Sequence, residues 1–108
     1  GVNASLNLSA LPVLDGAEQT VAAGILSSLQ PANIRLRRAI RNAESMANHA
    51  RYPLLFDPQT AGGLLASVPA DKVDACVQAL VTLGYIHTSI IGAVHPQNDT
   101  LEPIEIRD

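Results

Sequence analysis

Residues 64–94 read LLASVPADKVDACVQALVTLGYIHTSIIGAV, and this pattern predicts a strand, a helix and a second strand. Residues 64–68 form a short, almost continuously apolar run, which is typical of a central strand. Pro69 suits the start of the helix, and Gly84 suits the residue just after its end. With a strand over residues 85–94, the segment predicts a β-α-β unit, which resembles half of a ferredoxin-like fold.

The helix of this unit has one apolar face. Its apolar side chains recur at steps of three and four residues, which predicts that they are buried. They are Val73, Cys76, Val77, Leu80 and Leu83. Cys76 is the one cysteine of the chain, and on this face we expect a small buried side chain rather than a reactive thiolate. One cysteine also excludes an internal disulfide framework and a cysteine-based metal cluster.

The opening residues carry a second strand pattern. Apolar and polar side chains alternate over residues 2–9, which predicts a strand with one buried and one wet face. Asp15 and Glu18 then have the spacing of a capping box, so we expect a short helix that ends near Gly24.

The remaining elements complete a single domain over residues 1–108. An apolar stripe predicts a longer helix over residues 32–49. Residues 101–106 are expected to form a last strand, at a sheet edge because of Pro103. The predicted fold class is therefore α+β: a mixed sheet with helices packed on it, partly ferredoxin-like. Because the chain starts almost directly in a strand, we expect it to be part of a longer protein.

Composition excludes several classes of protein. Hydrophobic residues make up 47% of the 108 residues and charged ones 16%, which is too apolar for a disordered chain. No apolar run is long enough to span a membrane. Aromatic residues are 3% and the net charge is -3, so we expect no nucleic-acid partner. There is no basic-then-apolar leading segment, which favours the cytoplasm.

Positive charge is concentrated in one stretch. Five of the seven basic residues lie between positions 35 and 51, opposed there only by Glu44. They are Arg35, Arg37, Arg38, Arg41 and Arg51. Two interpretations stay open: the solvated face of an amphipathic helix, or a surface for phosphate or an acidic partner.

Segment 55–65, LFDPQTAGGLL, is the strongest candidate for chemistry. Pro58 keeps Asp57 out of the right-handed helical region, and the glycine pair 62–63 permits positive φ and close approach of a ligand. Consecutive backbone N–H groups there could form an anion-binding nest. The Gln59 amide and the Thr60 hydroxyl would add donors. A tight loop whose side chains cap their own backbone is an equally good interpretation.

Other motifs for chemistry are missing from the sequence. There is no glycine-rich nucleotide fingerprint, no phosphate-binding loop with lysine, no paired-histidine zinc motif and no C-x-x-C. His49, His87 and His95 lack ligand-like spacing, so we expect no metal site and no catalytic residue in this chain.

The stretch Asp57-Pro58-Gln59-Thr60-Ala61-Gly62-Gly63-Leu64-Leu65 closely resembles D-P-Q-T-S-G-G-L-L, the signature of selenophosphate synthetases (selenide, water dikinases). More broadly, the chain is similar to the C-terminal domain of the aminoimidazole-ribonucleotide-synthetase-like superfamily. Residues 11–17, 22–25 and 91–94 also resemble family stretches, so the likeness covers nearly the whole chain. Ala61 replaces the usual serine, and residues 27–33 lack the family's G-G-T turn while keeping Asn33.

The resemblance implies a function for the longer enzyme. Such enzymes make selenophosphate from ATP, selenide and water. Their reactive residue and Mg²⁺ site lie in an N-terminal half, which this chain lacks. The resemblance therefore implies ATP and Mg²⁺ as cofactors bound mainly by that half, and an isolated domain without activity. It also implies the N-terminal domain as partner, a homodimer at full length and, from residues 27–31, an oxidoreductase domain fused ahead.

The family's glycine-containing loop faces the nucleotide phosphates. Carried over to this chain, the resemblance implies a phosphate- and nucleotide-binding loop made by Asp57, Gln59, Thr60, Gly62 and Gly63, with Asn33 as a further contact. Two alternatives remain: another ATP-dependent enzyme of the superfamily, such as a thiamine-monophosphate kinase or a hydrogenase-maturation protein, and a non-catalytic module that docks a partner through its arginines.

Overall fold

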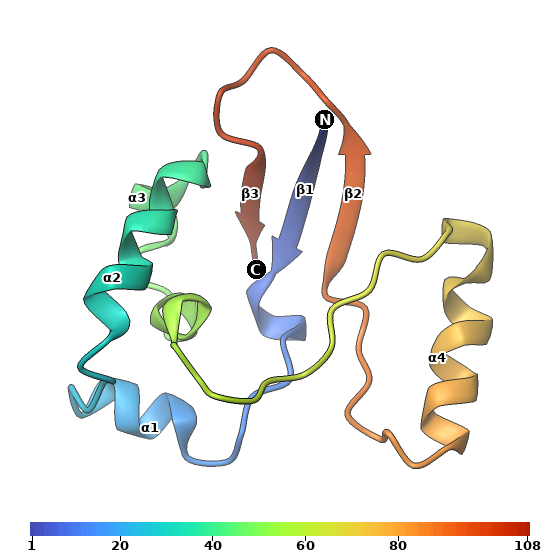
Figure 1. Cartoon of the computed structure of the whole chain (residues 1–108), viewed down its shortest axis with the longest axis horizontal. Helices are drawn as coiled ribbons and strands as arrows, with labels where there is room; N and C mark the ends of the chain where they lie inside the picture. Colours follow the sequence, from blue (N-terminus) through green and yellow to red (C-terminus); the bar gives the residue numbers. More distant parts are fainter.

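The computed structural model describes residues 1–108 and has the predicted α+β class. A three-stranded mixed sheet has the order β2-β1-β3 (Figure 1). The central strand β1 (Val2–Asn7) pairs antiparallel with β2 (Gly92–Pro96) and parallel with β3 (Ile104–Arg107). The predicted first strand is thus confirmed. The two later strands are shorter than predicted: β2 begins at Gly92 instead of residue 85, and β3 begins at Ile104 instead of residue 101.

The alternation of β1 gives the sheet two different faces. Asn3 lies opposite His95, and Ser5 lies opposite Glu105, so polar side chains share one face. Ala4 and Leu6 lie on the other face.

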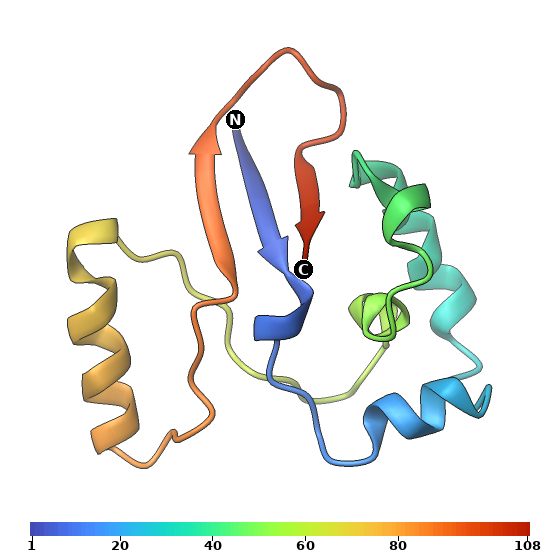
Figure 2. The same cartoon turned by 180° about the vertical axis from the view of Figure 1, so that it is seen from behind.

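Helical segments gather along the β3 side of the sheet, as Figures 1 and 2 show. They are α1 (Ala17–Ala22), α2 (Gln30–Ile34), η2 (Arg35–Ala39), α3 (Ala43–Met46) and η3 (Tyr52–Phe56). A short turn, η1 (Leu8–Ala10), follows β1 directly. The core lies where these segments meet the sheet, and it consists of Leu8, Ile40, Phe56 and Ile106.

The predicted single helix over residues 32–49 is wrong, because the chain is extended at Ile40. Ile40 forms a parallel bridge with Ile104, and the Arg41 N–H donates to the Ile104 carbonyl at 2.8 Å. Next to this bridge, Asn42 Nδ2 donates to the Ile106 carbonyl at 2.7 Å. Asn42 Oδ1 accepts from the Ile106 N–H at 2.9 Å. These contacts with β3 replace helical hydrogen bonds, and no helical periodicity in the sequence reveals them.

The capping box predicted at Asp15 and Glu18 does not form. Gly16 begins α1 with a φ of 87°, no side chain caps the helix, and the Glu18 carboxylate binds Arg51 instead. The predicted end near Gly24 is confirmed: Gly24 has a φ of 74°, and its N–H donates to the Val21 carbonyl.

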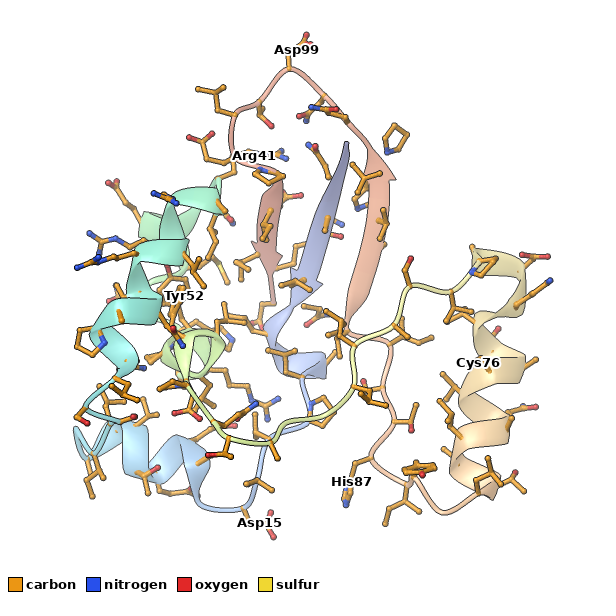
Figure 3. The ribbon with its side chains drawn as sticks, viewed as in Figure 1. Asp15, Arg41, Tyr52, Cys76, His87 and Asp99 are labelled. Carbon is orange, nitrogen blue, oxygen red and sulfur yellow. The ribbon has the colours of Figure 1, made fainter.

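The helix predicted after Pro69 is present as η4 (Ala70–Lys72) and α4 (Val73–Thr82). Gly84 ends it with a φ of 101°, as the sequence predicts. The predicted buried stripe is wrong, because α4 contains no buried residue, Leu83 is 75% exposed and Cys76 is half-buried. Figure 1 shows the cause: α4 stands beyond β2, apart from the sheet. In Figure 3, Cys76 accordingly lies far from Tyr52, which packs against the core.

The strand predicted over residues 64–68 is also absent. Residues 58–68 form an extended arm between η3 and η4, and no backbone group in it makes a hydrogen bond within the chain. Leu64 is fully exposed, and Leu65 is 78% exposed. An apolar strand needs a neighbouring edge to pair with, and none lies against this arm.

The arm and α4 make the molecule unusually open. The chain exposes 8060 Å², whereas a compact protein of this mass exposes about 5,700 Å². Its radius of gyration is 14.9 Å, against about 13 Å for a compact domain of this length. No helix is long and apolar enough to cross a membrane.

Leucine truncations test where the chain is packed. Leu8 is fully buried, so Leu8→Ala should lower the free energy of unfolding by about 2–5 kcal/mol in urea titrations. The matched control Leu64→Ala, at a fully exposed leucine, should change it by less than about 0.5 kcal/mol. Equal losses for the two variants would contradict the placement of the arm.

Candidate functional site

Two amides on α2 hold the start of the predicted ligand loop. The Gln30 side chain, only 3% exposed, donates from Nε2 to the Pro53 carbonyl at 2.9 Å. The Asn33 side chain donates from Nδ2 to the Phe56 carbonyl at 3.2 Å, directly before Asp57. The structure therefore brings Asn33 to the base of the loop. Sequence reasoning missed Gln30, because its partner lies 23 residues away and no spacing rule connects the two.

The loop itself points its polar groups at solvent. The predicted residues Asp57, Gln59, Thr60, Gly62 and Gly63 are all exposed. The Asp57 N–H donates to the Leu54 carbonyl at 3.2 Å, but the later N–H groups of the loop have no partner within the chain. A row of free N–H donors, with a hydroxyl and an amide beside it, can bind an anion when one is supplied.

The positive φ that the glycine pair permits is not adopted in this structure. Neither Gly62 nor Gly63 has a positive φ. The loop therefore lacks the alternation of right- and left-handed residues that forms an anion-binding nest. A β-carbon added at Gly63 would meet nothing within 4 Å, and one at Gly62 would meet the flexible side chain of Gln59. The backbone of the exposed arm therefore does not itself require glycine at these positions. A requirement for glycine would arise only from a ligand or another chain that lies close to the backbone.

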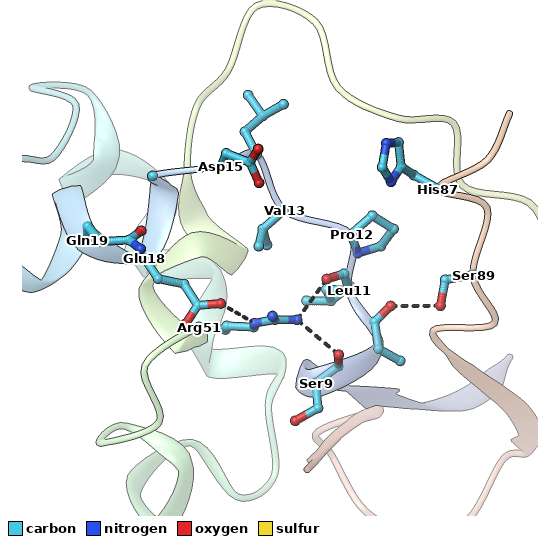
Figure 4. A pocket seen from close by; sticks show the side chains of 13 residues that line it. Ser9, Leu11, Pro12, Val13, Asp15, Glu18, Gln19, Arg51, His87 and Ser89 are labelled. Atoms are coloured by element: carbon cyan, nitrogen blue, oxygen red, sulfur yellow. Dashed lines mark hydrogen bonds and ion pairs between the residues drawn. The ribbon is translucent and has the colours of Figure 1, made fainter.

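Arg51 is the second organising residue of this region (Figure 4). Its Nε donates to Glu18 Oε1 at 2.6 Å, which ties η3 to α1. Its Nη1 lies within hydrogen-bond distance of three backbone carbonyls that follow β1. They are those of Leu8 at 3.2 Å, Ser9 at 2.9 Å and Leu11 at 2.9 Å. The sequence shows Arg51 only as one of five clustered cations.

A cavity of about 500 Å³ opens beside Arg51. Residues 9–16 line one side of it, and Glu18 and Gln19 line another. His87 and Ser89 face them, and the Ser89 hydroxyl donates to the Ala10 carbonyl at 2.8 Å (Figure 4). Arg51 and Ser89 already bond to backbone carbonyls, so these two side chains are occupied within the chain.

Metal-binding side chains do not converge in the structure: no three of its His, Cys, Asp or Glu residues could hold one ion. Two carboxyl groups are electrostatically stabilised. Hydrogen bonds from Ser9 and His49 hold the pKa of Asp108 below its ordinary value. The hydrogen bond and charge of Arg107 hold the pKa of Glu105 below its ordinary value.

Comparison with known proteins supports the resemblance carried by the loop motif. No protein-family model matches the chain. The chain is 33% identical to the selenide, water dikinase of Dechloromonas aromatica over 93 residues, which are 85% of the chain and 26% of that protein. It is 29% identical to selenide, water dikinase 2 of Peptoclostridium acidaminophilum over 94 residues, 87% of the chain and 27% of that protein.

A shorter match is closer: the selenide, water dikinase of Nitrosomonas eutropha is 47% identical over 51 residues, which are 46% of the chain. The similarity to selenide, water dikinases predicted from the motif is therefore confirmed. The chain spans about a quarter of the length of the relatives it matches most fully, which is consistent with one domain of such a protein.

Replacing Arg51 tests its clamping role. Arg51→Lys keeps the charge but loses the forked geometry that reaches several carbonyls, so the free energy of unfolding should fall by about 1–3 kcal/mol in urea titrations. Glu18→Gln, which weakens only the half-exposed ion pair, should cost less than about 1 kcal/mol. A larger loss for Glu18→Gln would mean that the ion pair, not the carbonyl contacts, is the main interaction.

The contacts of Asp108 predict a pH dependence. Because its folded pKa lies below the ordinary 3.8, these contacts stabilise the fold above that pH and are lost as pH falls through the folded pKa. Between about pH 5 and pH 2 the unfolding free energy should therefore fall further in the wild type than in Asp108→Asn. Parallel curves for the two proteins would show that Asp108 does not contribute.

Proposed function

We propose that this chain is the C-terminal domain of a selenide, water dikinase, and that it supplies a phosphate-binding loop to the nucleotide site of the longer enzyme. The observation that carries the proposal is the motif of residues 57–65, which lies on an exposed arm with unpaired N–H donors. The similarity of the chain to a selenide, water dikinase over 85% of its length favours this family over other ATP-dependent enzymes of the superfamily.

In this proposal the longer enzyme converts ATP, selenide and water to selenophosphate, AMP and phosphate. Phosphoryl transfer depends on positioning the phosphates and stabilising their charge. The backbone N–H groups around Gly62 and Gly63 and the Thr60 hydroxyl would face the phosphates, and the Gln59 amide would add a polar contact. Asn33 and Gln30 hold the base of the loop through the carbonyls of η3, a positioning role.

ATP-bound Mg²⁺ would supply charge neutralisation at the phosphates. This chain offers no group of side chains able to hold the ion, so the remaining three quarters of the enzyme would bind it. The reactive residue would lie there as well. On this basis we expect the isolated domain to bind phosphates weakly and to have no activity of its own.

The N-terminal part of the same protein is the partner that we propose for the arm and α4. The arm exposes Leu64 and Leu65, and Leu83 is exposed directly after α4. The chain as a whole exposes about 2,300 Å² more than a compact protein of its mass. A standard protein interface buries about 1,600 Å² in total, so the excess is large enough for one docking surface. A full-length homodimer would then form mainly through the N-terminal part.

One observation favours a second candidate, a docking module. Four arginines of the basic stretch are exposed, and none of them forms an ion pair within the chain. They are Arg35, Arg37, Arg38 and Arg41. If they bind an acidic partner, Arg37→Glu with Arg38→Glu should abolish association with that partner. If the enzyme proposal is right, the same double variant should leave selenide-dependent turnover unchanged.

Selenide-dependent conversion of ATP to AMP by the full-length protein tests the proposed function. Gly63→Val should reduce this rate by roughly 10²-fold, because its side chain keeps the phosphates from the backbone donors. Its free energy of unfolding in the isolated domain should not change, since nothing lies within 4 Å of the added carbon. Ala50→Val, at an exposed residue outside the motif, is the matched control.

The outcomes separate the two parts of the proposal. Normal turnover by Gly63→Val would contradict the role of the loop and leave the family assignment standing. A competent wild-type protein that forms no selenide-dependent AMP would contradict the assignment itself.

A further inference from the structure

The polar face of the sheet contains a second, smaller cavity of about 130 Å³. Five separate segments converge on it: β1, β2, β3, the loop after β2 and the turn that follows Ile40. Its polar lining consists of Asn3, Arg41, His95, Asn98, Glu105 and Arg107. In Figure 3, Arg41 lies near the end of the sheet where the chain turns at Asp99, at the opposite end of the molecule from Asp15.

The floor of this cavity is preorganised. Asn3 lines the cavity, and Ser5 lies on the same face of β1 just outside it. Each is only 4% exposed, although polar residues are mostly found at the surface. Asn3 donates from Nδ2 to Asn98 Oδ1 at 2.6 Å, and Ser5 Oγ lies 2.9 Å from His95 Nε2. These contacts fix Asn98 and His95 at the rim, so polar atoms can be held in place before any ligand arrives.

Cations outnumber anions in the cavity. Arg107 Nη2 binds Glu105 Oε2 at 2.8 Å, so that pair is neutral as a unit. Arg41 has no carboxylate within ion-pair distance and leaves one uncompensated positive charge. The low pKa of Glu105, caused mainly by Arg107 and then by the charges of Arg41 and His95, is consistent with this excess.

We propose that this cavity binds a phosphate group, held by the guanidinium of Arg41 with donors from Asn98 and Arg107. Arginine presents a planar fork of donors that matches phosphate oxygens, and an unpaired arginine above a fixed polar floor is suited to this role. The cavity is polar, which excludes an apolar ligand, and it is much smaller than the roughly 300–1,000 Å³ typical of drug-sized ligands. The exposed arginines of η2 would raise the local concentration of anions.

This site is independent of the loop proposed above. The cavity lies at the start of β1, beside Asn3, whereas Leu8, just after the end of β1, shares the core with Phe56 at the base of the loop. Failure of one site therefore leaves the other untouched.

Titration of the isotope-labelled chain with inorganic phosphate at constant ionic strength tests the site, read from the side-chain amide signals of Asn3 and Asn98. We expect saturable shifts with a Kd in about the millimolar range. Arg41→Ala should weaken binding at least about tenfold. Arg37→Ala removes the same charge from an exposed arginine that does not line the cavity, and it should weaken binding less than about twofold.

A neutral variant separates geometry from charge. Asn98→Ala leaves the net charge unchanged and should still weaken binding several-fold. Shifts that never saturate, or equal losses for Arg37→Ala and Arg41→Ala, would overturn the proposal, since both indicate unspecific attraction. O-phosphoserine in place of phosphate identifies the source: tighter binding of the monoester indicates a phosphorylated molecule, and tighter binding of inorganic phosphate indicates the free ion. Either order supports a phosphate site.

Discussion

The guanidinium group of Arg51 is the contact on which the helical half of the molecule depends. Arg51 directly precedes η3, and its guanidinium group binds the carbonyls of Ser9 and Leu11 as well as the carboxylate of Glu18. Those carbonyls follow a strand and belong to no ladder, so they would otherwise lack a partner. By satisfying them, Arg51 fixes the direction in which the chain leaves β1, the position of α1 and the start of η3. The candidate loop follows η3 directly, so the position of η3 also determines where the loop begins.

Local sequence patterns predicted the elements that local interactions determine. They failed where contacts between residues distant in the sequence determine the conformation. Alternation was sufficient for β1, and the glycine stops were sufficient for the ends of α1 and α4, because each depends on a few neighbouring residues. The helix over residues 32–49 failed because Asn42 pairs with Ile106, 64 residues away. At the candidate site the motif indicated the loop, and a separate family stretch indicated Asn33, which the structure places at the base of the loop. Neither pattern revealed Gln30 or the backbone conformation of the glycines, which depend on tertiary packing.

The open half of the molecule has a simple physical cause. An apolar segment without a partner strand keeps its backbone polar groups in water, and an amphipathic helix without a sheet beneath it keeps its apolar face exposed. Both conditions hold for the arm and for α4. The compact half, from the sheet to η3, contains every buried residue of the chain. The candidate motif of residues 57–65 lies between the two halves: the residue before it is held by Asn33, and its later residues make no hydrogen bond within the chain.

The sheet joins strands from opposite ends of the sequence. Ala4 lies beside Ile104, so the pairing of β1 with β3 closes a loop of about 100 residues that contains every helix. Such non-local pairing slows folding. During synthesis at about 5–20 residues per second, β1 would wait roughly 5–20 s for its parallel neighbour. Within this domain the first strand to be made is thus the last to be completed, and one edge of β1 stays unprotected until β3 has been synthesised.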